Sequence, residues 1–415
     1  MKTICLYFQV HQPLRYRQFR FFDIGNNEYY YDDYSNETIL KRVANNCYLP
    51  TNKMLLDQIK KYKGEFKVAF SISGVALDQF HLYAPEVIHS FQELVQTGCV
   101  EFIAETYSHS LAAIADTEEF KKQVESHAEQ IERLFGQRPK VFRNTELIYS
   151  NEIGTIVSEL GFDAILAEGV NPIFGPNHPG FVYKNTLDSN LKVLLRNFPL
   201  SDDIAFRFSD ESWSEWPLTT KKYISWLNRG NQDNELINLF MDYETFGEHQ
   251  KNDTGINDFL KSFASNVLHN SQFKFMTPSE VVANKQPVDV LDAPHPSSWA
   301  DCEKDLSAWL GNEIQQEAFR KLYDLSEKIS HCDDRKLLKD WQYLQTSDHF
   351  YYMSTKSLSD GEVHADFNPY DSPFDAFINY MNVLNDFKIR LDRSIIQKKK
   401  AMLNWRKKER AYTLS

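Results

Sequence analysis

The sequence lacks the short motifs that mark nucleotide, metal or serine chemistry. It contains no GxGxxG turn and no P-loop, the glycine-rich segments that hold nucleotide phosphates, and no GxSxG turn that presents a serine nucleophile. Histidines never recur as an HxxxH or HExxH pair, the spacing of zinc ligands on a helix. We therefore expect no nucleotide cofactor and no metal site, and the serine hydrolase class is disfavoured.

Cysteine and long apolar runs are also scarce. The five cysteines are an odd number and form no CxxC pair, so free thiols in a reducing compartment are the simplest interpretation. The apolar segment at 3–10 is too short to span a membrane and has no signal-peptide cleavage site. We expect a cytoplasmic protein with no membrane partner.

Basic residues are outnumbered, with 46 Lys and Arg against 58 Asp and Glu, for a formal net charge of -12. This balance argues against nucleic acid, or an anionic membrane, as the main partner, and a neutral polymer or a small-molecule substrate fits better. Aromatic residues are abundant, at 21 Tyr, 30 Phe and 7 Trp. They can fill a large core, and some can stack on the C–H faces of sugar rings. The oligomeric state is not indicated.

The first 285 residues alternate strand-like and helix-like segments. The strand candidates are 3–10, 66–71, 100–104, 140–143, 164–167, 193–196, 236–242 and 273–276. Amphipathic helices are predicted between several of them, as at 118–134 and 152–160. The alternation predicts a parallel sheet with covering helices, and seven or eight such units favour a closed barrel over a doubly wound sheet.

The pattern changes near residue 286, where a loop containing Pro294 and Pro296 precedes a run of helices. Helices are predicted at 312–330, 335–346, 373–386 and 387–409. We expect two domains: a catalytic β/α barrel at 1–285, and a helical C-terminal subdomain at 286–415 that completes the substrate cleft. The basic tail at 397–410 fits a solvated helix end, where cations are favoured.

Two predicted strands end in carboxylates. The apolar run from 141 leads to Glu146, and the run from 236 leads to Asp242 and Glu244. A carboxylate beside apolar strands is costly to bury unless it is paired or used. Because the C-terminal ends of barrel strands meet at one mouth, we expect Glu146 and Asp242 to converge across one site. Two such carboxyls, one nucleophile and one acid/base, are what a sugar-cleaving enzyme needs.

Other polar side chains follow further strand ends and form the predicted substrate-binding set. His11 and His109 could donate hydrogen bonds to sugar hydroxyls, and Trp299 could form the wall of a sugar subsite. Arg143 could lower the pKa of a nearby carboxyl or serve as an ion-pair partner in the barrel wall. The predicted substrate-binding residues are His11, Glu101, Glu105, Glu244, His249, Trp299 and Asp348.

Together these segments resemble glycoside hydrolase family 57, in its α-amylase-like branch. The matching stretches run in order along nearly the whole chain: 10–13, 98–101 with 105–107, 142–149, 241–249, 299–312 and 346–351. The resemblance implies a (β/α)7 barrel, an incomplete TIM-like barrel, followed by a helical C-terminal subdomain. It also implies retaining chemistry on α-glucans such as starch, glycogen or maltooligosaccharides, through a covalent glycosyl-enzyme intermediate.

The resemblance also assigns roles. By motif position, Glu146 matches the nucleophile and Asp242 the general acid/base, while His11, Glu101 and Asp348 match positions that line the substrate site. Many relatives carry a histidine two residues before His11, where this chain has Gln9.

Three alternatives stay open. A 4-α-glucanotransferase or branching enzyme shares the covalent intermediate and differs in its acceptor. A metal-dependent polysaccharide deacetylase is suggested by the segment 131–143, but it needs an aspartate and two histidines, and the missing HxxxH argues against it. A non-catalytic glucan-binding protein is disfavoured because Glu146 and Asp242 are both present.

Overall fold

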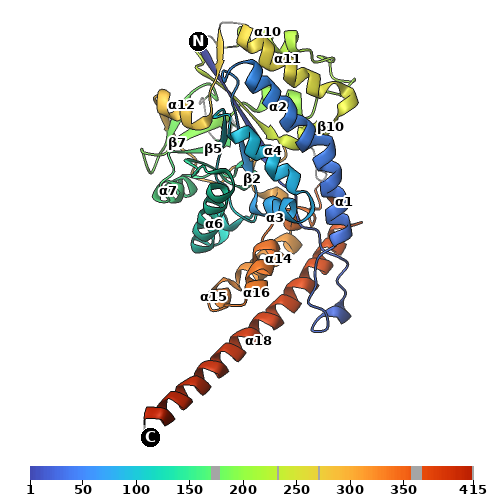
Figure 1. Ribbon diagram of the computed structural model, residues 1–415, viewed down its shortest axis with the longest axis vertical. Helices are drawn as coiled ribbons and strands as arrows, with labels where there is room; N and C mark the ends of the chain where they lie inside the picture. The colour runs from blue at the N-terminus through green and yellow to red at the C-terminus, as the bar shows by residue number, and fades with distance from the viewer. Residues whose placement is uncertain (170–177, 231–232, 270–271, 357–366, 414–415) are drawn as a thin grey trace.

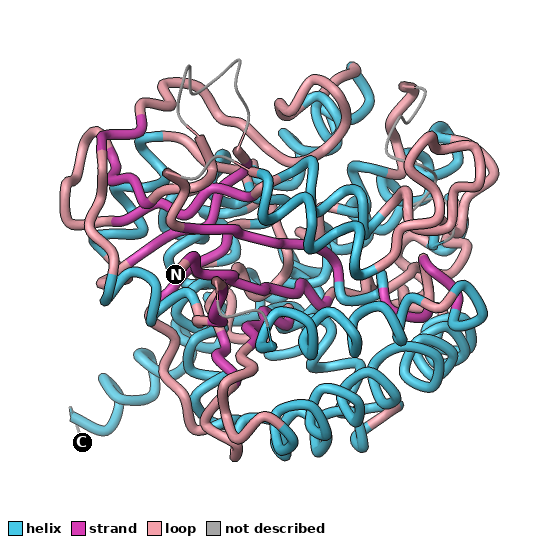
Figure 2. Tube along the Cα trace, turned by 90° about the horizontal axis from the view of Figure 1, so that it is seen from above, coloured by secondary structure: helices cyan, strands magenta, loops and turns pink. Residues whose placement is uncertain are grey.

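The structure is a computed structural model that describes residues 1–169, 178–230, 233–269, 272–356 and 367–413. Its centre consists of parallel strands, each hydrogen-bonded to a neighbour in one of two sheets, and Figure 2 shows these strands running through the middle of the molecule between helices. Their order is β8 (Leu236–Asp242), β1 (Lys2–Val10), β2 (Val68–Ile72), β3 (Val100–Phe102), β4 (Val141–Arg143), β5 (Ala164–Glu168) and β7 (Lys192–Arg196).

Isolated contacts connect the two sheets. A parallel bridge between Ala104 and Phe142 joins the strands β3 and β4. Between β7 and β8, the Asn197 amide donates to the Asn238 carbonyl at 2.9 Å. β11 (Phe273–Phe275) pairs with the first residues of β1. This arrangement is the incomplete TIM-like (β/α)7 barrel predicted from the sequence.

Side chains alternate across β1 between the barrel interior and the surrounding helices, as period-two strand geometry requires. Cys5 and Tyr7 pack in an inner cluster, whereas Ile4, Leu6 and Phe8 belong to the cluster between strands and helices. Both sets are fully buried or nearly so. The same alternation turns the polar residues at the end of β1 toward the mouth of the barrel.

Helices cover the outside of the strands in both views (Figures 1 and 2). The helix predicted at 118–134 begins after Asp116, which caps the first amides, and ends at Gly136 with φ +70°. The main barrel helices are α1 (Asp33–Val43), α2 (Leu49–Lys61), α3 (Gly74–Tyr83), α4 (Pro85–Val95), α6 (Thr117–Phe135), α7 (Asn151–Glu159), α9 (Phe198–Ala205), α10 (Thr220–Arg229), α11 (Ile256–His269) and α12 (Pro278–Asn284).

Two short strands extend the second sheet beyond the prediction. β6 (Val182–Asn185) runs antiparallel to β7, and β12 (Asp289–Leu291) pairs in parallel with β6. Both are too short to give a periodic sequence signal. β12 lies just after residue 285, and the proposed domain boundary there stays a prediction.

The region after β12 is helical, as expected, with different boundaries. The helix predicted at 312–330 is divided into α14 (Glu313–Tyr323) and α15 (Ser326–Ile329). The two helices predicted at 373–386 and 387–409 are one, α18 (Pro373–Thr413), whose far end extends beyond the body (Figure 1). The remaining helices are α13 (Ser307–Leu310), α16 (Arg335–Leu344) and α17 (Asp348–Tyr351).

Candidate active site

Glu146 lies in a strained turn directly after β4. The strand ends at Arg143, and Thr145–Leu147 form the 3₁₀ turn η3. Glu146 has φ +56° and Leu147 φ +52°, in the left-handed region that is unfavourable for residues with a side chain. Such strain persists where the surroundings fix the residue, and it concentrates at functional sites. The turn therefore holds the Glu146 carboxylate in a defined position.

Both carboxylate oxygens of Glu146 accept hydrogen bonds. The indole N–H of Trp299 donates to Oε2 at 2.6 Å, and His109 Nε2 lies 3.0 Å from Oε1. Glu146 is 5% exposed, so these donors replace most of its contact with water. Hydrogen bonds to the charged form favour an ionised carboxylate.

His109 is a buried cation between two carboxylates. Its Nδ1 lies 3.0 Å from Glu105 and its Nε2 the same distance from Glu146. Burial opposes the charge, but the hydrogen bonds and charges of the two glutamates outweigh it and raise the pKa of His109 to about 9. Burial likewise opposes charge on Glu105, yet His109 lowers the pKa of that carboxyl. The side chain of Gln9 donates to Glu105 at 3.2 Å.

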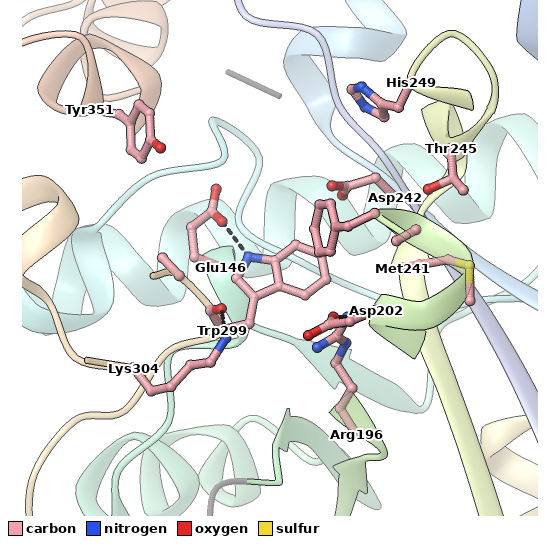
Figure 3. A pocket seen from close by; sticks show the side chains of 13 residues that line it. Glu146, Arg196, Asp202, Met241, Asp242, Thr245, His249, Trp299, Lys304 and Tyr351 are labelled. Carbon is pink, nitrogen blue, oxygen red and sulfur yellow. Dashed lines mark hydrogen bonds and ion pairs between the residues drawn. The ribbon is translucent and has the colours of Figure 1, made fainter. Parts of the chain in front are cut away.

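Asp242 ends β8, beside Gln9 of β1 in the strand register. It lines the same cleft as Glu146, and Figure 3 shows the two carboxylates facing a common space next to the Trp299 ring. A second, adjoining cavity is lined by the same two carboxylates together with His249 and Trp299. The cleft therefore brings together the two carboxylates that the strand-end argument predicted to converge.

His11 and Asp348 form one wall of this second cavity. His11 Nε2 lies 3.0 Å from Asp348 and its Nδ1 lies 2.7 Å from Ser73 Oγ. The His11 ring stacks on the His109 ring with centroids 4.0 Å apart. Burial and the neighbouring His109 charge lower the pKa of His11, so a neutral imidazole lies against an imidazolium.

Glu244 lies in the 3₁₀ turn η4 (Tyr243–Thr245), directly after Asp242, and lines the same cavity. Its carboxyl accepts a hydrogen bond from the Tyr48 hydroxyl. Burial, followed by the charge of Asp242, raises the pKa of Glu244 to about 8. Glu244 is therefore mostly protonated at neutral pH.

Two arginines lie over the Trp299 ring. The guanidinium of Arg143 is 4.9 Å and that of Arg196 5.4 Å from the ring centroid. Arg196 is bonded to Glu168 at 3.0 Å and to Asp202 at 2.5 Å. Arg143 is fully buried, and none of its guanidinium nitrogens has a hydrogen-bond partner among the described residues. Its charge is therefore directed at the cavity that it lines.

The structure does not bring every predicted residue to the cleft. Glu101 points into the barrel at a deeper layer, where the backbone N–H of Ser279 at the start of α12 donates to it at 2.9 Å. Glu105 is fully buried behind His109. Glu101 thus stabilises a helix N-terminus rather than lining the cleft where the sequence placed it.

The cleft also contains residues outside the predicted substrate-binding set. Lys304 and Tyr351, from the helical region, and Phe206, after α9, line the same cavity as Asp242. His109 and Arg143 were considered from the sequence without a fixed role. Arg143 follows the inward-facing Val141 by two residues, so strand alternation was a signal that it points inward.

No group of three His, Cys, Asp or Glu side chains is placed to hold a metal ion within the described ranges. A search of the same residues for a helix with the length and apolar character of a membrane span also finds none.

Comparisons with known proteins identify related sequences. The profile of the family described as "Glycosyl hydrolase family 57" matches residues 5–294. A protein of Methanocaldococcus jannaschii described as "Putative alpha-amylase" is 41% identical over an alignment of 418 positions, gaps included. The alignment covers 97% of this chain and 87% of that protein.

Solved structures share the fold at low sequence identity. The 4-alpha-glucanotransferase of Thermococcus litoralis aligns with TM-score 0.62 and 17% identity over 84% of this chain and 56% of that one, so this chain spans just over half its length. A branching enzyme of Thermococcus kodakaraensis aligns with TM-score 0.70 and 13% identity over 96% and 91% of the two chains.

Proposed function

The chain belongs to glycosyl hydrolase family 57, and we propose that it is a retaining α-amylase that hydrolyses α-1,4 bonds in starch, glycogen or maltooligosaccharides. The observation that carries the proposal is the cleft shared by Glu146 and Asp242. A retaining glycosidase needs one ionised carboxylate as nucleophile and one carboxyl that carries a proton. The surroundings of the two residues differ in the sense that these roles require.

In the first step, a carboxylate oxygen of Glu146 attacks the anomeric carbon while Asp242 gives a proton to the departing glycosidic oxygen. The C–O bond to the leaving sugar breaks as the bond to Glu146 forms. The two donors on Glu146 favour its ionised form. On the acid side, burial and the Asp242 charge raise the pKa of the neighbouring Glu244 to about 8, so this side of the cleft holds a proton at neutral pH.

In the second step, Asp242 takes a proton from a water molecule, and the water oxygen attacks the anomeric carbon. The bond to Glu146 breaks and its carboxylate is restored. Two displacements at the same carbon return the original configuration. Asp242 then carries the proton needed for the next cycle.

The helical region contributes to this chemistry. Trp299, Lys304 and Tyr351 all follow residue 285 in the sequence and line the cavity that contains Asp242. Asp348 lines the adjoining cavity beside His11, which lies 3.0 Å from it. These contacts support the proposal that the subdomain at 286–415 completes the cleft of the barrel at 1–285.

Transfer to a sugar acceptor, as in a 4-α-glucanotransferase or branching enzyme, is the second candidate. The rings of Phe206, Trp299 and Tyr351 line the cleft next to Asp242. Aromatic faces pack on sugars and displace water, and this would favour a sugar over water as the acceptor.

Product analysis separates the candidates. The enzyme is incubated with maltoheptaose, the products are separated by length, and the anomer released first is identified by NMR. We expect only shorter sugars, first released as the α-anomer, and a Glu146→Gln variant about 10⁴-fold slower or worse. Products longer than maltoheptaose would assign transfer instead. No turnover by the unsubstituted enzyme would contradict both glycosidic functions, and β-anomers would contradict retention.

A further inference from the structure

A second groove, which we call the α18 groove, lies between the loop after β1 and the beginning of α18. Its volume is about 700 Å³, within the usual range of ligand sites. Two side-chain amides bind the loop to the helix: Asn379 accepts from Phe19 N–H at 2.6 Å, and Asn382 donates to the Phe19 carbonyl at 3.0 Å. Figure 1 shows this loop against the upper part of α18. The groove is therefore a fixed junction between the barrel and the helical region.

The α18 groove combines aromatic and amide groups. Tyr16, Phe19, Phe21 and Tyr370 line it with Asn379, whose side-chain amide donates to the Tyr370 hydroxyl at 3.0 Å. Phe21 is 71% exposed, so one ring edge of the groove is open to a ligand. Apolar ring faces beside hydrogen-bonding groups suit the C–H faces and hydroxyls of a sugar.

The charged groups of the groove disfavour an anionic ligand. Asp32, Asp371 and Asp375 line it, with Arg20 as the one basic side chain among its described lining residues. Like charges repel, so a phosphate or an acidic peptide would be disfavoured. Carboxylates accept hydrogen bonds from hydroxyl groups without that cost. A neutral polyhydroxylated chain is the ligand class that fits best.

The groove adjoins the catalytic cleft. Pro13 lines the cleft and Tyr16 lines the groove, three residues later, so their Cα atoms are at most roughly 11 Å apart. Asp348 lines the cleft, and the next residue, His349, stacks on the Tyr16 ring at 4.3 Å. The groove and the cleft are therefore lined by residues that lie next to one another.

We propose that the α18 groove is a secondary binding site for a glucan chain whose other part occupies the catalytic cleft. This inference rests on the proposed function, because it assigns to the groove the polymer that the cleft would cut. A polymer held at the groove presents its bonds to the cleft at a high effective concentration. A short oligosaccharide cannot gain in this way, so the enzyme should favour long substrates.

Phe21→Ala tests the groove, with Phe22→Ala as its matched control. Phe22 is 84% exposed, packs edge-on against Phe21, and is absent from the groove lining. Each variant is made with Glu146→Gln, and its binding to glycogen is measured by retardation in native gels that contain glycogen. We expect Phe21→Ala to weaken binding about threefold to tenfold and Phe22→Ala to change it little. Equal binding by both variants, or no retardation of the parent, would overturn the proposal.

Kinetics with Glu146 intact give the second readout. Phe21→Ala should lower the ratio of kcat/KM for glycogen to kcat/KM for maltotriose by a similar factor, and Phe22→Ala should not. If no glucan is turned over but glycogen retardation still depends on Phe21, the groove stands and the proposed function fails. If light scattering shows that Phe21→Ala dissociates a dimer while glycogen binding is unchanged, the groove is an interface between copies of this chain and the proposal is overturned.

Discussion

The two carboxylates of the cleft lie in opposite electrostatic surroundings. Glu146 faces donors, with the Trp299 indole at 2.6 Å and the His109 cation at 3.0 Å. Asp242 is followed by another acid, Glu244, whose pKa burial and the Asp242 charge raise to about 8. One side of the cleft stabilises a negative charge, and the other retains a proton. Residue type alone does not distinguish the two acids, because their neighbours set the charge state.

The difference has its origin in separate parts of the chain. The donors on the Glu146 side come from the segment after β3 and from the helical region, where His109 and Trp299 lie. The Asp242 side is completed by Tyr48, next to α2, which donates to Glu244. Changes on one side should therefore affect ionisation of the nucleophile, and changes on the other should affect proton delivery.

On the Asp242 side of the cleft, Asp242→Asn should produce the largest effect on activity. The amide cannot deliver a proton, so kcat for maltoheptaose should fall about 10²- to 10⁴-fold. A 4-nitrophenyl maltooligosaccharide, whose leaving group needs no proton, should lose much less in its first step. Release of 4-nitrophenolate is measured beside maltoheptaose cleavage. Asp203→Asn, which changes an aspartate paired with Arg207 outside the cleft lining, is the control. Equal losses on both substrates would contradict the assignment of Asp242 as the acid.

His109→Gln should remove the cation from the Glu146 side of the cleft. Loss of a charged hydrogen bond of about 2–3 kcal/mol corresponds to a fall in kcat of about 30- to 150-fold. Without the imidazolium the pKa of Glu146 should rise, so the acidic limb of the kcat/KM profile should move to higher pH.

His127→Gln is the control for this change. His127 is equally buried and its Nδ1 accepts from the Glu105 N–H, and burial lowers its pKa, so it is neutral. Its replacement should destabilise the fold without moving the acidic limb. If both variants give the same pH profile, the charge on His109 has no part in holding Glu146 ionised.

The alternation of strands and helices made the barrel predictable, because period-two strands and amphipathic helices are strong local signals. The β8 boundaries agree with the prediction at both ends. The convergence of Glu146 and Asp242 followed from the topology of parallel strands. The backbone geometry after the strands was harder to predict. The predicted strand at 140–143 and β4 both end at Arg143, but the turn with positive φ that holds Glu146 has no signal in the sequence.

The depth at which a side chain lies within the barrel could also not be predicted from the sequence. Glu101 and Glu105 both face inward, yet Ser279 of α12 binds Glu101 at a deeper layer and His109 binds Glu105 near the mouth. Their partners are 178 and 4 residues away, so the Glu101 contact has no local signal. The role of His109 as a bridge likewise depends on Glu146, a neighbour in space from the next strand.

On the Glu146 side of the cleft, Trp299→Phe should have a smaller effect on activity than His109→Gln. The ring remains, but the indole N–H bond to Glu146 at 2.6 Å is lost. A bond to a charged group contributes about 1.5 kcal/mol or more, so kcat should fall about tenfold. Trp309→Phe, a buried tryptophan of α13, controls for the loss of packing volume. An increase in KM alone, with kcat unchanged, would restrict Trp299 to substrate binding.

Glu244→Gln should have the smallest effect, seen mainly in stability. The folded state holds the Glu244 proton with a pKa of about 8, against an ordinary value of 4.5. Its contribution to stability is therefore complete below about pH 4.5 and is lost as the pH rises through 8. Glutamine stays neutral and keeps an oxygen for the Tyr48 hydroxyl, so the Tm of the variant relative to the parent should increase by a few degrees between pH 5 and 8.5. Glu248→Gln, which removes an acid paired with Arg42 at 2.7 Å, should show no such increase. Parallel Tm curves for Glu244→Gln and the parent would mean that Glu244 is ionised at neutral pH. The Asp242 side of the cleft would then hold no proton, and the contrast with the Glu146 side would disappear.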